Sequence, residues 1–128
     1  SSAASDVYKR QVEKRGDDIL FGDLTWPAGA AMAAMPDGPF TVGIRPHFIT
    51  PNKRGSGAVK LSGRIEITEL SGSESVAHFA VSETVWVSLS AGAQPFRVGE
   101  AHDFFLDPTH CYYFDSSGQL VATGGGHG

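Results

Sequence analysis

Hydrophobic and polar residues alternate most regularly in the second half of the chain. Ile65 and Ile67 are flanked by the polar residues Arg64, Glu66 and Thr68, so an extended segment here has one apolar face and one solvated face. This pattern predicts a half-buried β-strand. Helical periodicity is nearly absent along the chain, and we therefore expect an all-β fold.

Gly, Pro, Ser and Asn separate the remaining short apolar segments. We expect the other strands within residues 19–24, 40–44, 76–81, 85–89, 103–106, 111–114 and 119–121. Turns at 71–73 and 115–118 join neighbouring strands into hairpins. The segment 27–39 is rich in Ala, Gly and Pro, and it predicts a loop or a single helical turn.

Seven or eight short strands with tight turns are typical of a small barrel of the oligonucleotide/oligosaccharide-binding (OB) type or of a compact sandwich. We favour the barrel because closure leaves no unpaired sheet edge. A chain of 128 residues has the length of a single domain with one modest core. The polar, flexible segment 51–57 predicts a break across the middle of the domain, at which the sheet could divide in two.

The two ends of the chain stand apart from this pattern. Residues 1–11, with the sequence SSAASDVYKRQ, resemble translated adapter sequence. We interpret them either as a non-native leader or as native sequence. The Gly-rich residues 123–128 predict a disordered tail. The predicted β domain is therefore 12–122.

Composition and charge argue against several classes of protein. The net charge is −4 and the basic residues are scattered, which disfavours nucleic acid as a partner because phosphate binding depends on clustered Lys and Arg. The single cysteine, Cys111, forms no internal disulfide and fits a cytosolic setting. No apolar run approaches the roughly 18 to 20 residues that cross a bilayer.

Few residues are candidates for catalysis or metal binding. The sequence contains neither a GxxxxGK[ST] phosphate-binding loop nor a Gly-x-Ser-x-Gly elbow, so we expect no enzyme activity. Neutral imidazole and thiolate bind zinc, but His47, His78, His102, His110 and Cys111 lack ligand spacing apart from the adjacent last pair. Neighbouring side chains in a strand point to opposite faces, and we expect no metal site.

Three phrases occur in a fixed order along the chain. They are Gly43-Ile44-Arg45-Pro46, then Gly63-Arg64-Ile65-Glu66-Ile67-Thr68-Glu69-Leu70-Ser71-Gly72-Ser73-Glu74, and then Asp107-Pro108 followed by Tyr113-Phe114-Asp115 and Gly118-Gln119-Leu120. Together they resemble the C-terminal TOBE domain of the ATP-binding subunit of maltose-type and glycerol- or glycerol-phosphate-type ABC importers. The resemblance covers about residues 19–122.

The resemblance implies an OB-like β domain that supports ATPase dimerisation and regulation without cofactors of its own. ATP and Mg would be bound in the nucleotide-binding domain of the parent subunit. The implied partners are that domain, a second ATPase subunit and, through the parent, membrane permease subunits at the inner face of a bacterial plasma membrane. The candidate interface or regulatory residues are Arg45, Pro46, His47, Glu69, Ser71, Gly72, Phe114 and Asp115.

Several residues in these phrases also allow other interpretations. His47 and Phe48 replace the family's usual acidic residue and histidine, which puts any polar contact there in doubt. Residues 70–74 resemble the LSGGQ signature, which binds phosphate at a helix N-terminus. Apolar and polar residues alternate on both sides of this segment, however, and this pattern predicts a hairpin turn between two strands instead. Arg45 offers a guanidinium fork to a partner or anchors a loop within the domain. The sequence Leu-Ser-Gly-Ser-Glu at 70–74 resembles the corresponding sequence of polyol-type members of that family.

Two functions of other classes stay open. The first is a free-standing module that binds a small oxyanion or a sugar, since aromatic side chains such as Trp26 and Trp86 stack on sugar faces. More often such residues belong to a core or a subunit interface. The second is a nucleic-acid-binding barrel, which the net charge disfavours.

Overall fold

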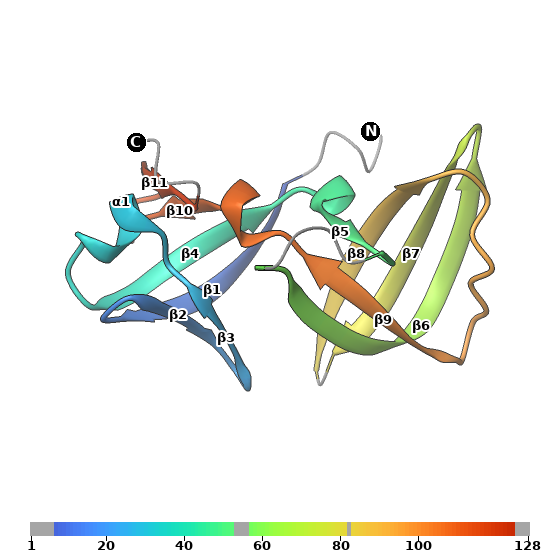
Figure 1. Ribbon diagram of the computed structural model, residues 1–128, viewed down its shortest axis with the longest axis horizontal. Coiled ribbons are helices and arrows are strands. Elements are labelled where there is room, and N and C mark those ends of the chain that lie inside the picture. The colour runs from blue at the N-terminus through green and yellow to red at the C-terminus, as the bar shows by residue number, and fades with distance from the viewer. Residues whose placement is uncertain (1–6, 53–56, 82, 125–128) are drawn as a thin grey trace. The chain divides into compact units, whose positions relative to one another are not determined.

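The computed structural model describes residues 7–52, 57–81 and 83–124, and it confirms an all-β fold of short antiparallel strands. In chain order the elements are β1 (Tyr8–Arg15), β2 (Asp18–Phe21), β3 (Leu24–Pro27), α1 (Ala30–Ala33), β4 (Gly38–Ile44), η2 (Pro46–Phe48), β5 (Ile49–Thr50), β6 (Val59–Ser71), β7 (Glu74–Val81), β8 (Thr84–Ala91), β9 (Ala101–Leu106), η3 (Pro108–His110), β10 (Tyr112–Phe114) and β11 (Leu120–Thr123) (Figure 1). The described residues form two compact units: the barrel unit, 45–107, and the sheet unit, 7–44 with 108–124.

The barrel unit contains a five-stranded sheet in the order β5-β9-β6-β7-β8. Its two outer strands approach each other, and the Ser88 hydroxyl on β8 donates a hydrogen bond to the carbonyl oxygen of Ile49 on β5. The sheet is therefore a nearly closed barrel, as the sequence predicts. Closure leaves little free sheet edge.

Aromatic and aliphatic side chains from neighbouring strands fill this barrel. Ile65 pairs with Phe79, and Phe79 pairs with Trp86, so the three side chains share one face of the sheet. All three are buried. The rings of Phe79 and Phe104 stack with their centroids 4.0 Å apart, which fixes the centre of the core.

A β-bulge interrupts the alternation on β6. The register with β7 shifts between Ile65 and Ile67, so Glu66 is an extra residue on this strand. A bulge of this kind moves the following side chains to the opposite face. Ile65 is 1% exposed whereas Ile67 is 51% exposed. The prediction that both isoleucines lie on one buried face is therefore wrong for Ile67.

The segment 51–57 does not divide a sheet, contrary to our expectation. The strands on either side of it, β5 and β6, belong to the same five-stranded sheet. The boundaries between the two units fall instead after Ile44 and after Asp107. Residues 53–56 lie outside the described part of the chain.

The sheet unit is a six-stranded sheet in the order β11-β10-β4-β1-β2-β3. Residues 19–24, predicted as one strand, form parts of the hairpin β2–β3 instead. Gly22 turns the chain there with φ of 56°, a conformation that glycine adopts without steric cost. The predicted helical turn within 27–39 is confirmed as α1, and the predicted final hairpin is confirmed as β10–β11.

Strand β1 includes residues 8–11 of the segment that the sequence predicts as a possible leader. Tyr8 pairs with Ile44 and Gln11 pairs with Thr41, in regular antiparallel register. At the other end Thr123 closes β11, and the Gly124 N–H donates to the Cys111 carbonyl oxygen at 2.9 Å. Residues 1–6 and 125–128 lie outside the described residues. The non-native origin of 1–11 and the limits of the domain stay predictions.

A buried lysine on β1 has an exposed carboxylate as its partner. Lys14 is 2% exposed, and its Nζ lies 2.9 Å from Oδ1 of Asp37. The same oxygen accepts the backbone N–H of Gly16 at 2.9 Å. The hydrogen bond from Lys14, followed by that from Gly16, holds the pKa of Asp37 below its ordinary value.

This pair predicts a loss of stability in acid. Because folding lowers the pKa of Asp37, its carboxylate stabilises the fold above the unfolded-state pKa, and this contribution disappears as pH falls through the folded-state pKa. We expect Asp37→Asn to lower the urea midpoint at pH 7 and to flatten its decrease below about pH 4. Urea unfolding of the wild type, of Asp37→Asn and of the turn variant Asp23→Asn at a series of pH values tests this. Equal acid dependence in all three proteins would contradict it.

Candidate functional site

The phrase at 43–46 carries the chain from β4 into the short helix η2. Arg45 is extended, with ψ of 137°, as expected for a residue before proline. Pro46 is buried in the first turn of η2. Backbone N–H groups in a first turn have no partner within the helix, so the N–H that proline lacks costs no hydrogen bond here. His47 follows as an exposed residue, and its ring stacks on that of Phe48 with centroids 5.0 Å apart.

His47 lines a cavity in the barrel unit. This cavity has a volume of about 440 Å³, within the range of about 300–1,000 Å³ that is usual for small-molecule sites. Its lining residues are His47, Phe48, Thr50, Pro51, Asn52, Glu74, Leu89, Ser90, Ala91 and Gln94. We call it the η2 cavity. It combines one aromatic and aliphatic wall with several hydrogen-bonding groups.

The polar groups of the η2 cavity are only partly engaged within the protein. The Thr50 hydroxyl donates to the Asn52 carbonyl oxygen at 2.9 Å. Gln94 donates through Nε2 to the Ala91 carbonyl oxygen at 3.0 Å, which leaves its Oε1 as an acceptor. The Ser90 hydroxyl is buried and has no hydrogen-bond partner among the described residues. Oε1 of Gln94 can therefore accept a further hydrogen bond, whereas the Ser90 oxygen has less than 1 Å² of exposed surface.

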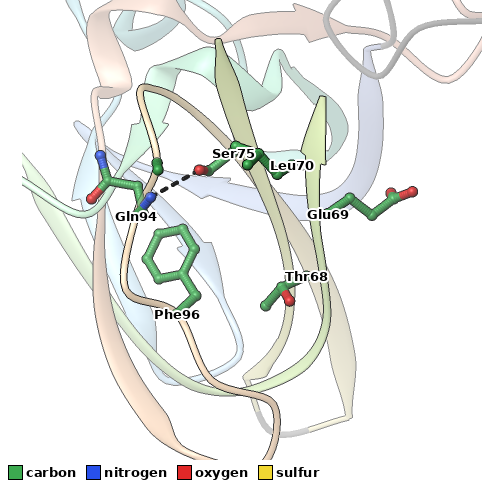
Figure 2. Close-up of a pocket in the computed structure, with 7 residues that line it drawn as sticks. Thr68, Glu69, Leu70, Ser75, Gln94 and Phe96 are labelled. Carbon is green, nitrogen blue, oxygen red and sulfur yellow. Dashed lines mark hydrogen bonds between the residues drawn. The ribbon is translucent and has the colours of Figure 1, made fainter. Parts of the chain in front are cut away.

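A smaller cavity, of about 100 Å³, lies between β6, the start of β7 and the loop 92–100 (Figure 2). It is lined by Thr68, Glu69, Leu70, Ser75, Ala93, Gln94 and Phe96. Since one water occupies about 30 Å³ of liquid, the space suits a few waters and is too small for a usual ligand. Gln94 lines both cavities.

Ser75 holds the loop 92–100 against the β6–β7 hairpin. Its hydroxyl oxygen accepts the Gln94 backbone N–H at 3.0 Å (Figure 2). The same hydroxyl group donates its hydrogen to the Gly92 carbonyl oxygen at 2.6 Å. At the far end of the loop, the Gly99 N–H donates to the Ile65 carbonyl oxygen at 2.7 Å. Anchors at both ends give Gln94 a defined position.

The other predicted residues of the barrel unit are not among the described residues that line the η2 cavity. Ser71 pairs with Glu74 across a hairpin, and Gly72 turns the chain with φ of 60°. The prediction of a hairpin turn at 70–74 is confirmed. The Glu69 carboxylate points away from Gln94 in Figure 2, and it lies 3.9 Å from Nε2 of His78.

Phe114 and Asp115 belong to the sheet unit. Nζ of Lys9 lies 4.8 Å from the centroid of the Phe114 ring, within the range of a cation–π contact. Oδ1 of Asp115 accepts the N–H and hydroxyl of Ser117 and the N–H of Gln119. The bonds from Ser117 and then Gln119 lower the pKa of Asp115. This part of the third phrase therefore shapes the β10–β11 turn.

The sequence did not single out Asn52, Glu74, Ser90 and Gln94 as site residues. Glu74 lies at the end of the predicted turn at 70–74, and Gln94 occupies an irregular loop without periodicity. The four residues come from separate elements, so only the closed barrel brings them to one cavity. Among the described residues, no group of three or more His, Cys, Asp or Glu side chains is placed to hold a metal ion.

Helices in the described part of the chain are short. None of them is long and apolar enough to cross a membrane.

Comparison with known proteins identifies the family. The family model of the TOBE domain matches residues 42–114, more than half of the 128 residues. A search of curated proteins found no match. The matched segment begins at Val42 on β4 and ends at Phe114 on β10, and these strands pair through Val42 and Tyr113. The chain belongs to the TOBE domain family.

Proposed function

We propose that this chain is a non-catalytic accessory and regulatory domain of the ATPase subunit of an ABC importer for a carbohydrate or a polyol. TOBE domains are found in ABC transporter ATPase subunits and in molybdate-binding proteins. The observation that carries the proposal is the family match over 42–114, which contains the first two phrases entirely and the beginning of the third. The importer type rests on the likeness of these phrases to maltose- and glycerol-type subunits.

In the proposed assembly, the domain contacts the nucleotide-binding domain of its own subunit and a second ATPase subunit. ATP and Mg are bound in that nucleotide-binding domain, and permease subunits lie beyond it at the cytoplasmic face of the membrane. Arg45, His47 and Glu69 are polar groups of the barrel unit that a partner can contact. The exposed side chains of Ile67 and Leu70, 51% and 65% accessible, offer apolar surface on the same hairpin as Glu69.

The coding sequence upstream of the chain tests this proposal directly. We expect it to encode, in frame and ending near Val12, an ATPase with a GxxxxGK[ST] loop and an ABC signature. In that case residues 1–11 replace the natural junction. A start codon beside Ser1 with no upstream ATPase would contradict the proposal and favour a free-standing module.

A second candidate function is that of a small-ligand module, and the η2 cavity is the observation that favours it. The described lining residues include Glu74 and no Lys or Arg, and a carboxylate repels an oxyanion at this part of the cavity. We therefore expect no heat of binding on calorimetric titration of the chain with molybdate or phosphate. A saturable heat with either anion would restore the oxyanion-binding function.

A further inference from the structure

Strand β6 (Val59–Ser71) extends beyond the strand that pairs with it on the side away from β7. On that side β9 pairs with β6 only as far as Arg64. Ile65 then bonds to the end of the loop 92–100 through both its N–H and its carbonyl oxygen, at 2.9 and 2.7 Å. Among the described residues, no strand pairs with 66–71 on this side. We call this side of residues 66–71 the β6 edge.

The alternation of the backbone determines which groups this edge presents. The N–H and carbonyl groups of Ile65 point away from β7, and those of successive residues in a strand point alternately toward and away from the antiparallel neighbour. The bulge at Glu66 adds one residue and shifts this alternation. The backbone groups of Ile67 therefore point toward β7, and those of Thr68 and Leu70 point away from it. An extended partner strand can bond to these outward-facing groups.

Side chains along the β6 edge are exposed on both faces of the strand. Ile67 and Leu70 have the largest apolar side chains there, and both are exposed. Thr68 and Glu69 are exposed as well. Thr68 and Leu70 also line the smaller cavity beside the loop 92–100 (Figure 2). An exposed strand edge with apolar side chains is a template for an added strand.

The charge of the β6 edge restricts the kind of strand that it binds. Residues 66–71 include Glu66 and Glu69 and contain neither Lys nor Arg. If a second copy of the chain paired here, the register that uses both outward-facing residues would place Thr68 opposite Leu70. The two Glu69 carboxylates would then lie opposite each other, and like charges in that position are destabilising. A Lys or Arg on a different strand would instead meet an opposite charge.

We propose that the β6 edge binds an extended, basic segment of another protein, which adds to the barrel sheet as an antiparallel strand. Side chains of a strand alternate between its two faces. The basic side chains of the added strand lie beside Glu69, and its apolar side chains lie on the other face beside Leu70. The inference deepens the proposed accessory function and rests on its assignment of this hairpin to a partner.

The test is a titration of the ¹⁵N-labelled 128-residue chain with the acetylated peptide Lys-Val-Lys-Val-Lys-Val, followed by NMR. We expect saturable shifts of the amide signals of Thr68 and Leu70 and slower hydrogen exchange of both N–H groups. The peptide Glu-Val-Glu-Val-Glu-Val has the same alternation with the opposite charge, and it should bind at least about fivefold more weakly. Equal binding of the two peptides, or no shift at the β6 edge with either, would overturn the proposal.

Methylation of the peptide backbone separates strand pairing from charge attraction. Directly opposed residues of an antiparallel pair share a face, so the valines lie opposite Thr68 and Leu70 and direct their N–H groups toward β6. N-methylation of the valines should therefore abolish binding, whereas N-methylation of the lysines should preserve it. If both modified peptides bind equally well, the backbone does not pair and the proposal is wrong.

Two charge-reversal variants locate the binding surface. Glu69→Lys should weaken binding of the Lys-Val peptide about fivefold or more. Glu83→Lys makes the same change in the exposed turn between β7 and β8, at the opposite end of β7, and should leave binding unchanged. Equal affinities of the two variants would contradict the proposal. So would concentration-dependent shifts of the β6-edge amides without peptide, because a second copy would then be the occupant. None of these results would alter the test of the upstream coding sequence.

Discussion

Gly63→Ala should destabilise the barrel unit by about 3 kcal/mol, at the upper end of the cost of inserting a methyl group into a packed interior. A Cβ atom at Gly63 would lie 2.5 Å from the carbonyl oxygen of Ala80 and 2.9 Å from Cδ2 of Phe79. The carbonyl belongs to the β6–β7 ladder, where Ala80 pairs with Arg64. The Phe79 ring is held by its stack on Phe104. Neither neighbour can move without loss of other contacts.

Urea unfolding of the two glycine variants Gly63→Ala and Gly57→Ala measures this effect. A Cβ at Gly57 would meet nothing within 4 Å, so that change should alter the free energy of unfolding by no more than about 0.5 kcal/mol. Equal midpoints for the two variants would show that the β6–β7 ladder relaxes around the new methyl group. A large decrease for Gly63→Ala alone would confirm the close approach.

The same contact gives a physical reason for a glycine at the start of the second phrase. Gly63 opens this phrase at a position where the neighbouring strand leaves no room for a side chain. Gly43 in the first phrase has a similar role, since a Cβ there would lie 2.9 Å from the Phe114 ring. The two glycines thus explain part of the family resemblance through packing. They do not by themselves indicate a ligand.

Local sequence patterns predicted most of the strands and turns of this fold. Alternating apolar and polar residues on both sides of a Gly-containing turn predicted the hairpin at 70–74. The turn that begins at Asp115 predicted the hairpin β10–β11. The exposed position of Ile67 was not predictable by periodicity, because a bulge adds a residue without a distinct sequence signal. The division into two units also depends on which distant strands pair, such as β4 with β10.

The cavities were the least predictable feature. Ser90 and Gln94 have no motif around them, and their importance arises from the closure of the barrel and the anchoring of the loop 92–100 by Ser75. His47 was selected from the sequence as part of the first phrase, and the structure places it on the η2 cavity. Of the other selected residues, Gly72 and Asp115 shape turns, whereas Pro46 is buried in η2. Motifs here identified the family more readily than the cavity.

The core of the sheet unit contains a hydrogen bond between two large aromatic side chains. Nε1–H of Trp26 donates to Oη of Tyr113 at 2.9 Å, and both residues are buried, with 1% and 0% exposure. Burial raises the pKa of Tyr113 above its ordinary value. The phenol therefore stays neutral into alkaline pH and continues to accept this bond.

Tyr113→Phe should lower the free energy of unfolding by about 2 kcal/mol, because it leaves the Trp26 N–H buried without its acceptor. The change removes one oxygen and keeps the ring, so lost packing contributes little. Trp26→Phe removes the donor and also leaves a cavity. In the double variant the donor and the acceptor are both absent, and its loss should be smaller than the sum of the two single losses by about 1 kcal/mol. Chemical denaturation of the four proteins gives this coupling, and strictly additive losses would mean that the bond contributes nothing to stability.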